Sequence, residues 1–209
     1  MQQVLVIHGG ETFETYEDYW RYLENYELDF EKSQNKEKGW KNLLQENLGS
    51  DYQVILPQMP SPLNAKYTEW KLWLEKYIPF LQDNIIVIGH SLGGIFWTKY
   101  LSENTLPAKI KQLHLISAPF EDNIENRIGD IGIESYSLGD FNLQPENLKN
   151  IEKQVENIFL YHSQNDPMVP FADLEKYAQF LPSAQKIIFT DKGHFITDNF
   201  PEILENVKK

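Results

Sequence analysis

Residues 85–93 read Ile-Ile-Val-Ile-Gly-His-Ser-Leu-Gly, an apolar run followed at once by the pattern G-x-S-x-G. Four β-branched residues in succession favour a buried strand, and the apolar run at 95–101 resembles a helix. Between a strand and a helix, two glycines permit a sharp turn with a strained serine backbone and an exposed hydroxyl. We interpret Ser91 as a candidate nucleophile, the alternative being an ordinary turn serine.

Similar β-branched runs recur along the whole chain, with stretches of helical periodicity between them. Several are continuously apolar, which is typical of strands covered on both faces. The alternation predicts an α/β fold: a three-layer α/β/α sandwich around a mostly parallel six-stranded sheet in the order 2-1-3-4-5-6. The expected strands are residues 3–8, 52–56, 84–89, 112–117, 157–162 and 186–190.

Helical periodicity is clearest at residues 66–81, and Pro170 and Pro201 stand where a helix would begin. The helix from Pro170 is expected to end near residue 181, and the helix from Pro201 to run to the chain end. The sequence contains no internal repeat and no Gly/Ser linker, and its 209 residues suit one domain spanning 1–209.

Composition excludes several classes of protein. With no Cys, the chain cannot form a disulfide scaffold, a thiolate metal site or a cysteine nucleophile. A net charge of -12 opposes binding to nucleic acid. No apolar run approaches the roughly 18 residues that a membrane span needs, and the N-terminus lacks a secretory pattern. We expect a cytoplasmic protein without membrane insertion.

The segment 11–31 holds eight acidic residues and one basic residue, and so carries -7 of the net charge. It begins a helical acidic and aromatic insertion over about 11–48. Its apolar residues recur every three or four positions, as on one face of an amphipathic helix: Phe13, Tyr16, Trp20, Leu23, Tyr26 and Phe30. The stripe is expected either to pack on the domain or to form a lid over a pocket. In the second case Tyr16 and Trp20 would bind substrate.

A serine nucleophile needs a base and an acid that orients it, and both follow in the order Ser, Asp, His. Asp166 follows the fifth expected strand, and His194 follows the sixth behind Gly193. We assign His194 as general base and Asp166 as the carboxylate that orients it. Asp173 and Asp191 are the competing acids. The other histidines lack metal-ligand spacing, so no metal and no cofactor is expected.

Two backbone amides are expected to form an oxyanion hole. Leu92 opens the helix after Ser91, where the helix N-terminus favours developing negative charge. The second donor should follow the first strand, at His8-Gly9-Gly10, with Gly10 as the best candidate. In the predicted order, the first and third strands are neighbours, so both loops meet at one edge of the sheet.

With these elements in this order, the chain resembles the α/β-hydrolases, and in particular the small serine hydrolases of the retinoblastoma-binding-protein type (YdeN-like). The resemblance is carried by residues 4–9, 56–60, Trp70, 89–93, Asp166 with Pro167 and Val169, and Gly193-His194. It implies a minimal α/β-hydrolase fold without early antiparallel strands, acting on esters. The insertion that follows Gly10 departs from the family pattern.

The expected function is hydrolysis of carboxylic esters through an acyl-enzyme on Ser91, with thioesters and amides as further substrates. A small-molecule ester is the expected partner. The alternative is an inactive hydrolase-fold protein that binds a partner. A dehalogenase of this fold would carry Asp in place of Ser91.

Overall fold

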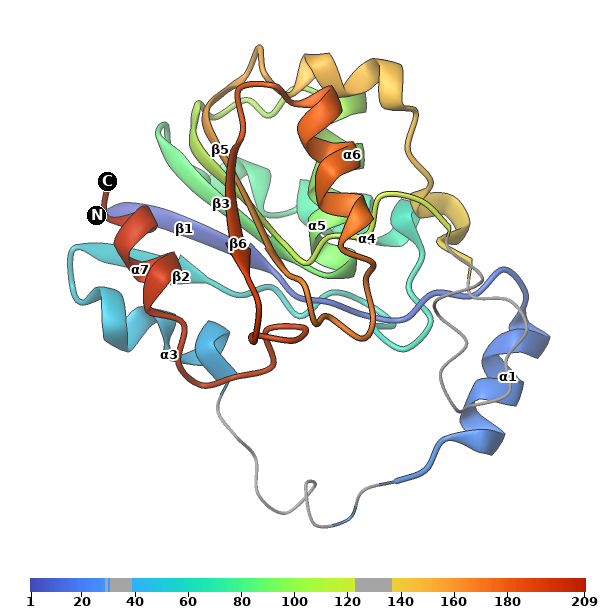
Figure 1. The fold of residues 1–209 in the computed structure, drawn as a ribbon. Coiled ribbons are helices and arrows are strands. Elements are labelled where there is room, and N and C mark those ends of the chain that lie inside the picture. The colour runs from blue at the N-terminus through green and yellow to red at the C-terminus, as the bar shows by residue number, and fades with distance from the viewer. Residues whose placement is uncertain (29, 31–38, 123–136) are drawn as a thin grey trace.

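The computed structural model describes residues 1–28, 30, 39–122 and 137–209, and a parallel six-stranded sheet forms its centre (Figure 1). The strands are β1 (Gln2–Ile7), β2 (Tyr52–Ile55), β3 (Ile85–His90), β4 (Ile110–Ile116), β5 (Val155–Ser163) and β6 (Gln185–Phe189). Their order is β2-β1-β3-β4-β5-β6, and each neighbouring pair is parallel. The predicted fold class and strand order are confirmed. The carboxyl ends of all six strands lie at one edge of the sheet.

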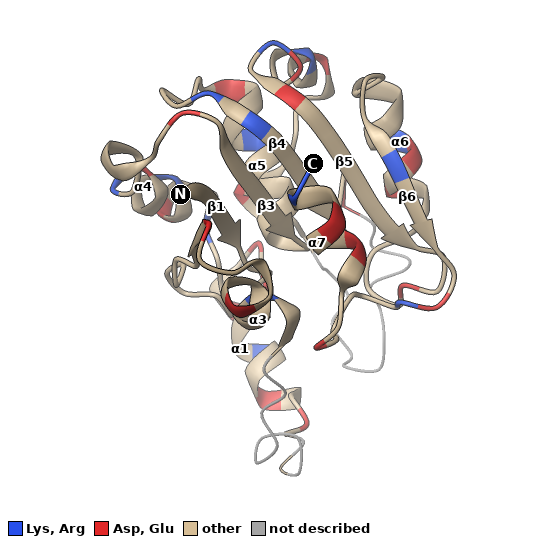
Figure 2. Ribbon diagram, turned by 90° about the vertical axis from the view of Figure 1, so that its left-hand side faces the viewer, with Lys and Arg blue, Asp and Glu red and all other residues tan. Residues whose placement is uncertain are grey.

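Helices cover both faces of the sheet. The helices α3 (Gly39–Leu48) and α7 (Pro201–Val207) pack on one face with Val4 and Val6 of β1. On the other face, Leu5 and Ile7 pack with α4 (Tyr67–Glu75), α5 (Leu92–Glu103) and α6 (Ala172–Phe180). Figure 2 shows α3 and α7 side by side on one face of the sheet. Because these two helical layers bury both faces of the sheet, the strands are continuously apolar.

Most expected helices form, with changed ends. The helix expected at 66–81 ends at Glu75, and Ile78–Phe80 continues as a short 3-10 helix. Pro79 accounts for the break, because it has no N–H to donate to the Glu75 carbonyl oxygen and its ring would clash with that carbonyl in an α-helix. The helix after Pro170 begins at Ala172, and α7 begins at Pro201 as predicted. Two further 3-10 helices were not predicted, η2 (Gly139–Phe141) and η3 (Pro145–Asn150). No helix in the described ranges is long and apolar enough to cross a membrane.

The acidic segment forms α1 (Tyr16–Asn25), which packs through a different face from the predicted one. Its buried residues are Tyr22 and Asp18, and the Tyr22 ring lies 5.2 Å from the buried ring of Phe13. Asp18 is buried because its carboxylate accepts from the Thr15 hydroxyl and pairs with Arg21. The rest of the predicted stripe is exposed: Tyr16 (66%), Trp20 (52%), Leu23, Tyr26 and Phe30. The prediction that this stripe packs on the domain is wrong.

The reason for this error is physical. Periodicity identifies the apolar face of a helix but does not say which neighbour, if any, covers that face. Figure 1 shows α1 to one side of the sandwich. A single buried tyrosine beside Phe13 anchors it, and the more extensive aromatic face points outward.

A closed ring of hydrogen bonds lies in the core between β4, β5 and α7. His114 Nε2 bonds to Gln112 Oε1 at 3.1 Å, and Tyr161 OH bonds to His114 Nδ1 at 2.9 Å. Asn206 Nδ2 donates to Tyr161 OH at 3.0 Å, and Gln112 Nε2 donates to the Asn206 carbonyl oxygen at 3.0 Å. Since Gln112 Oε1 is an acceptor, His114 is the Nε2–H tautomer. Burial lowers the pKa of His114 to about 3, so the ring requires a neutral imidazole.

Acid should therefore weaken the fold through His114. In the folded protein its pKa, about 3, lies below the ordinary value of 6.5. The contribution of neutral His114 to the free energy of unfolding is therefore complete above pH 6.5 and is lost as pH falls toward 3. Between pH 7.5 and 5, protonation of the unfolded chain at this one residue should lower the free energy of unfolding by about 2 kcal/mol. His114→Phe keeps the stacking on Phe159 and should be less stable than the wild type at pH 7.5. Between pH 7.5 and 5, however, its free energy of unfolding should fall by about 2 kcal/mol less than that of the wild type. Urea unfolding of both proteins at the two pH values measures this difference, and equal losses would contradict the assignment.

Candidate active site

The turn between β3 and α5 holds Ser91 in an unusual backbone conformation. Its φ is 54° and its ψ is -124°, a region that costs energy for any residue with a side chain. A Cβ on Gly93 would lie 2.3 Å from the Ile7 carbonyl oxygen, and a Cβ on Gly89 would lie 2.3 Å from the Gly93 carbonyl oxygen. Both positions therefore exclude larger residues. The predicted strand, turn and helix are present, with Ser91 half-buried at the carboxyl edge of the sheet.

His194 and Asp166 form a directly bonded pair beside this turn. His194 Nδ1 lies 2.9 Å from Asp166 Oδ2 and 3.1 Å from Oδ1, and the Asp166 side chain has no solvent exposure. Ser117 Oγ donates to Oδ2 at 2.6 Å, while the Met168 and Val169 amides donate to Oδ1 at 2.8 and 3.1 Å. Burial by itself would raise the pKa of Asp166, but the hydrogen bond and electrostatic interaction with His194, followed by the bonds from Ser117 and the Val169 amide, outweigh burial and hold the pKa below its ordinary range. Asp166 is therefore an ionised acceptor that fixes the Nδ1–H tautomer of His194.

The other ring nitrogen of His194 is left available. Nε2 is buried and has no hydrogen-bond partner in the described part of the chain. The loop that carries His194 is tied to the turn, because His90 Nε2 bonds to the His194 carbonyl oxygen at 2.8 Å and the two rings lie 4.9 Å apart. His90 directly precedes Ser91. An imidazole with a free basic nitrogen thus stands next to the serine turn.

The loop after β1 reaches the same place. A Cβ on Gly9 would lie 3.1 Å from Ser91 Cβ and 3.5 Å from Ser91 Oγ, so the Gly9 backbone lies against the serine side chain. A Cβ on Gly10 would lie 3.4 Å from Leu92 Cδ2 and 2.7 Å from the Pro62 carbonyl oxygen. The loop after β1 therefore lies against Ser91 through Gly9 and against the Leu92 side chain through Gly10. Gly10 and Leu92 are the two residues whose amides are the predicted donors.

His8 orients the peptide between Gly9 and Gly10. The Met59 amide donates to His8 Nε2 at 3.0 Å, so the hydrogen of the neutral ring is on Nδ1, which lies 2.6 Å from the Gly9 carbonyl oxygen. In a planar trans peptide the N–H points opposite to the C=O. The Gly10 amide therefore points away from the His8 ring. The Leu92 amide lies in the first turn of α5 and has no partner within its own helix.

Two residues that support this arrangement were missed by sequence reasoning. Ser117 has a φ of 44° and donates to Asp166, and Asn165 Oδ1 accepts from the Gly193 amide at 2.8 Å and from Ser163 Oγ at 2.7 Å. Their positions at the carboxyl ends of β4 and β5 are the sequence feature that could have identified them as residues of the site. Polar residues there meet at one edge in a parallel sheet.

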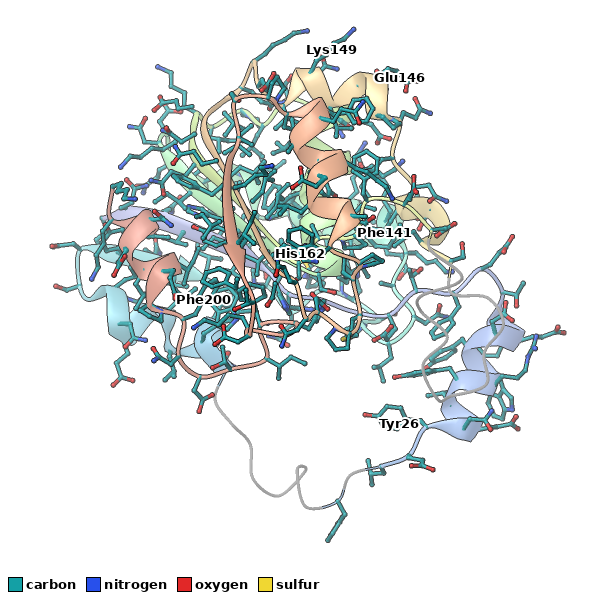
Figure 3. The ribbon with its side chains drawn as sticks, viewed as in Figure 1. Tyr26, Phe141, Glu146, Lys149, His162 and Phe200 are labelled. Atoms are coloured by element: carbon teal, nitrogen blue, oxygen red, sulfur yellow. The ribbon has the colours of Figure 1, made fainter. Side chains whose placement is uncertain are left out.

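Other sequence candidates lie elsewhere. Asp173 is buried in α6, where it accepts from the Phe120 amide and pairs with Lys176, so it is not a partner of His194. Tyr16 contacts Tyr19, and Trp20 Nε1 donates to Glu24, both within α1. Figure 3 shows Tyr26, at the end of α1, far to one side of His162 on β5. The structure does not bring Tyr16 and Trp20 to Ser91.

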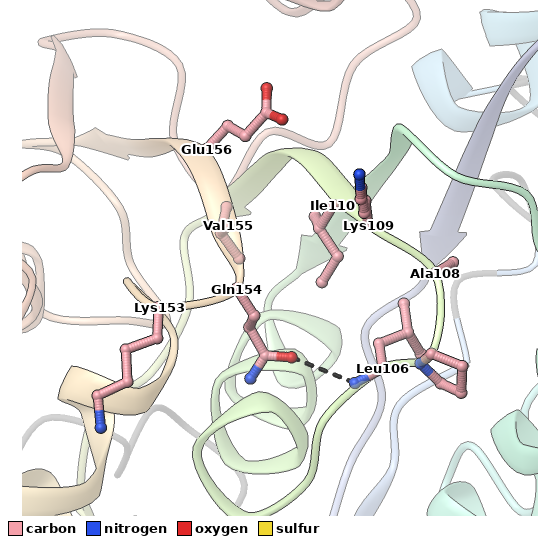
Figure 4. Close-up of a pocket in the computed structure, with 9 residues that line it drawn as sticks. Leu106, Ala108, Lys109, Ile110, Lys153, Gln154, Val155 and Glu156 are labelled. Atoms are coloured by element: carbon pink, nitrogen blue, oxygen red, sulfur yellow. Dashed lines mark hydrogen bonds between the residues drawn. The ribbon is translucent and has the colours of Figure 1, made fainter.

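A pocket of about 310 Å³ lies at the opposite edge of the sheet, between the amino ends of β4 and β5 (Figure 4). Leu106, Ala108, Ile110 and Val155 line it together with Lys153 and Gln154. Gln154 Oε1 accepts from the Leu106 amide at 3.2 Å across its floor. Because the strands are parallel, their carboxyl ends and Ser91 lie at the far edge. This pocket is separate from the candidate active site.

Comparisons with known proteins agree with this architecture. The sequence profile of the serine hydrolase family matches residues 30–207. The serine hydrolase RBBP9 of Rattus norvegicus is 27% identical over 172 residues, which covers 81% of this chain and 85% of the rat protein. The structure of the ydeN gene product from B. subtilis has a TM-score of 0.68 at 19% identity, covering 100% of this chain and 97% of that one. Naproxen esterase from Bacillus subtilis has a TM-score of 0.62 at 14% identity, covering 99% and 82%. The chain has the α/β-hydrolase fold and is a member of the serine hydrolase family.

Proposed function

We propose that this serine hydrolase cleaves carboxylic esters through an acyl-enzyme on Ser91, with His194 as the base and Asp166 as the orienting acid. The main support for this proposal is the hydrogen bonding of the two ring nitrogens of His194. Nδ1–H is held by a buried carboxylate, and Nε2 is unpaired beside the serine turn. A general base for a hydroxyl needs this arrangement.

The first half-reaction follows from these positions. His194 Nε2 takes the proton of the Ser91 hydroxyl as Oγ attacks the ester carbonyl carbon, and negative charge moves to the carbonyl oxygen. The amides of Leu92 and Gly10 donate to that oxygen, and each such donor is typically worth about 2.7 to 4 kcal/mol to the transition state. The imidazolium that forms is stabilised by Asp166. When the tetrahedral intermediate collapses, the C–O bond to the alcohol breaks and His194 returns the proton to the leaving oxygen.

The second half-reaction repeats these steps with water. His194 Nε2 removes a proton from water as its oxygen attacks the acyl carbon, and the same amides hold the oxyanion. Collapse releases the carboxylic acid and returns the proton to Ser91 Oγ. Esters are favoured as substrates because their alcohol leaving group needs less assistance than an amine. Esterases are also among the proteins of this fold, as naproxen esterase illustrates.

The direct test is labelling with a fluorophosphonate, which reacts with an activated serine hydroxyl. The wild-type protein should be labelled and should hydrolyse short-chain nitrophenyl esters, whereas Ser91→Ala should do neither. Gel fluorescence and release of nitrophenolate are the measurements. If folded wild-type protein is neither labelled nor active, the chain keeps the hydrolase fold without the reaction. Equal labelling of both proteins would remove Ser91 from the proposal.

The role of Asp166 as the orienting acid can be tested against Asp173, a second buried carboxylate that serves as a matched control. Asp166→Asn should lower kcat by about 10⁴-fold, because the amide stabilises the wrong tautomer of His194 and cannot stabilise the imidazolium. Asp173→Asn alters a carboxylate that is equally buried but bonds to the Phe120 amide and Lys176, and it should retain kcat within about threefold. Ester kinetics at pH 7.5, with thermal melting as the check on folding, measure both. Equal losses in the two variants would contradict the assignment of Asp166.

A further inference from the structure

The first turn of α3 is fastened to the loop that carries His194. The Gly39 amide donates to Asp198 Oδ1 at 2.6 Å, and the Trp40 amide donates to the Thr197 carbonyl oxygen at 2.8 Å. Trp40 Nε1 donates to the Phe195 carbonyl oxygen at 3.1 Å. These contacts join residues that are more than 150 positions apart in the sequence. The backbone around His194 is therefore held by α3 as well as by the sheet.

Lys41, the next residue of α3, is connected to His194 through His90. Its Nζ lies 3.1 Å from His90 Nδ1, and His90 Nε2 lies 2.8 Å from the His194 carbonyl oxygen. A charged ammonium has only donors, so His90 Nδ1 accepts from it and the hydrogen of the neutral ring is on Nε2. This tautomer is the one that can donate to the carbonyl of His194. Lys41, His90 and His194 thus form a chain of hydrogen bonds in one direction.

The charge of Lys41 is placed unusually for this chain. The protein has 31 acidic residues, yet within the described ranges the half-buried Lys41 makes no ion pair and donates to a neutral ring. Burial lowers the pKa of Lys41 to about 8. Burial, followed by the charge of Lys41, holds the pKa of His90 well below its ordinary value, so His90 stays neutral. Burying a cation without a carboxylate costs free energy. The hydrogen bond to His90 and the position of Nζ over the Trp40 ring, 5.2 Å from its centroid, offset part of that cost.

The His194 residue is consequently fixed at two points. Asp166 holds the ring through Nδ1, and His90 holds the main chain through the carbonyl oxygen. With only the first contact, the ring could pivot about Asp166 and change the direction of Nε2 relative to the serine turn. With both contacts, the direction of Nε2 is defined. A displacement of about 1 Å at such a group can cost about 100-fold in rate.

We propose that Lys41 is a positioning residue for the reaction: by donating to His90 it secures the hydrogen bond from His90 to the backbone of His194, and so aims Nε2 at Ser91. This inference rests on the proposed function for its kinetic consequence, while its geometric consequence at His194 can be observed without turnover.

The experiment compares three single variants. Lys41→Met removes the ammonium and keeps the length of the side chain, and Lys41→Arg restores a charged donor. Lys71→Met is the control, because Lys71 is also half-buried and its Nζ donates to a neutral side chain, Asn104 Oδ1, at 2.9 Å. Nitrophenyl ester kinetics give kcat and KM separately. The proton NMR resonance of His194 Nδ1–H, shifted far downfield by its bond to a carboxylate, reports the geometry at Asp166.

Lys41→Met should lower kcat by about 10- to 100-fold while changing KM much less, and should shift the His194 resonance. Lys41→Arg should recover most of kcat, and Lys71→Met should match the wild type in all readouts. In a His90→Phe background, which already lacks the bond to His194, Lys41→Met should have no further effect on kcat.

Wild-type kcat and an unshifted His194 resonance in Lys41→Met would overturn the proposal. Equal loss in the Met and Arg variants, in step with a lower Tm, would also overturn it, because it would identify a purely structural role. If wild-type protein neither hydrolyses esters nor is labelled at Ser91, the proposed function fails, and the resonance alone decides this inference: a shift in Lys41→Met but not in Lys71→Met supports it, and no shift overturns it.

Discussion

The close approach of the turn after β3 to the end of β1 is the constraint on which the site depends. Gly93 lies so near the Ile7 carbonyl oxygen that only glycine fits, and a Cβ on Gly94 would lie 2.5 Å from Ala118 Cβ. Parallel pairing of β1 with β3 fixes this approach, and it places Gly9 against the Ser91 side chain. The strained φ of Ser91 persists because the packing around the turn leaves no relaxed alternative. The same contacts thus position the Ser91 hydroxyl and the loop that holds the predicted amide donor Gly10.

Around that turn, a specific partner decides which ring nitrogen of His8, of His90 and of His194 carries a hydrogen. A main-chain amide accounts for the tautomer of His8, Lys41 for that of His90, and Asp166 for that of His194. His8 orients the Gly9–Gly10 peptide, His90 ties down the backbone of His194, and His194 keeps Nε2 free. Three rings of one type therefore have three separate tasks, because their hydrogen-bond partners differ. Burial keeps the pKa of His8 and of His90 low, which preserves their neutral forms.

The sequence predicted the sheet and the position of the candidate residues because both depend on local signals. β-branched runs mark buried strands, and a parallel sheet gathers the residues after its strands at one edge, which is why Asp166 and His194 meet. Periodicity in 11–31 could not predict that Tyr22 would be buried and Trp20 exposed, because it does not say which neighbour covers a helix face; here Phe13, just before α1, covers Tyr22. The contact between Lys41 and His90 was missed for the same reason. It joins two segments 49 residues apart that carry no shared motif.

The proposed reaction requires Ser91 to carry the acyl group during turnover. Mass spectrometry tests this directly on protein quenched with acid at intervals through the burst of an activated nitrophenyl ester, chosen so that breakdown of the acyl-enzyme is the slow step. We expect an adduct with the mass of the acyl group on the peptide that contains Ser91, formed at the rate of the nitrophenolate burst. An acyl group on a different residue, formed at that rate, would contradict the proposed role of Ser91.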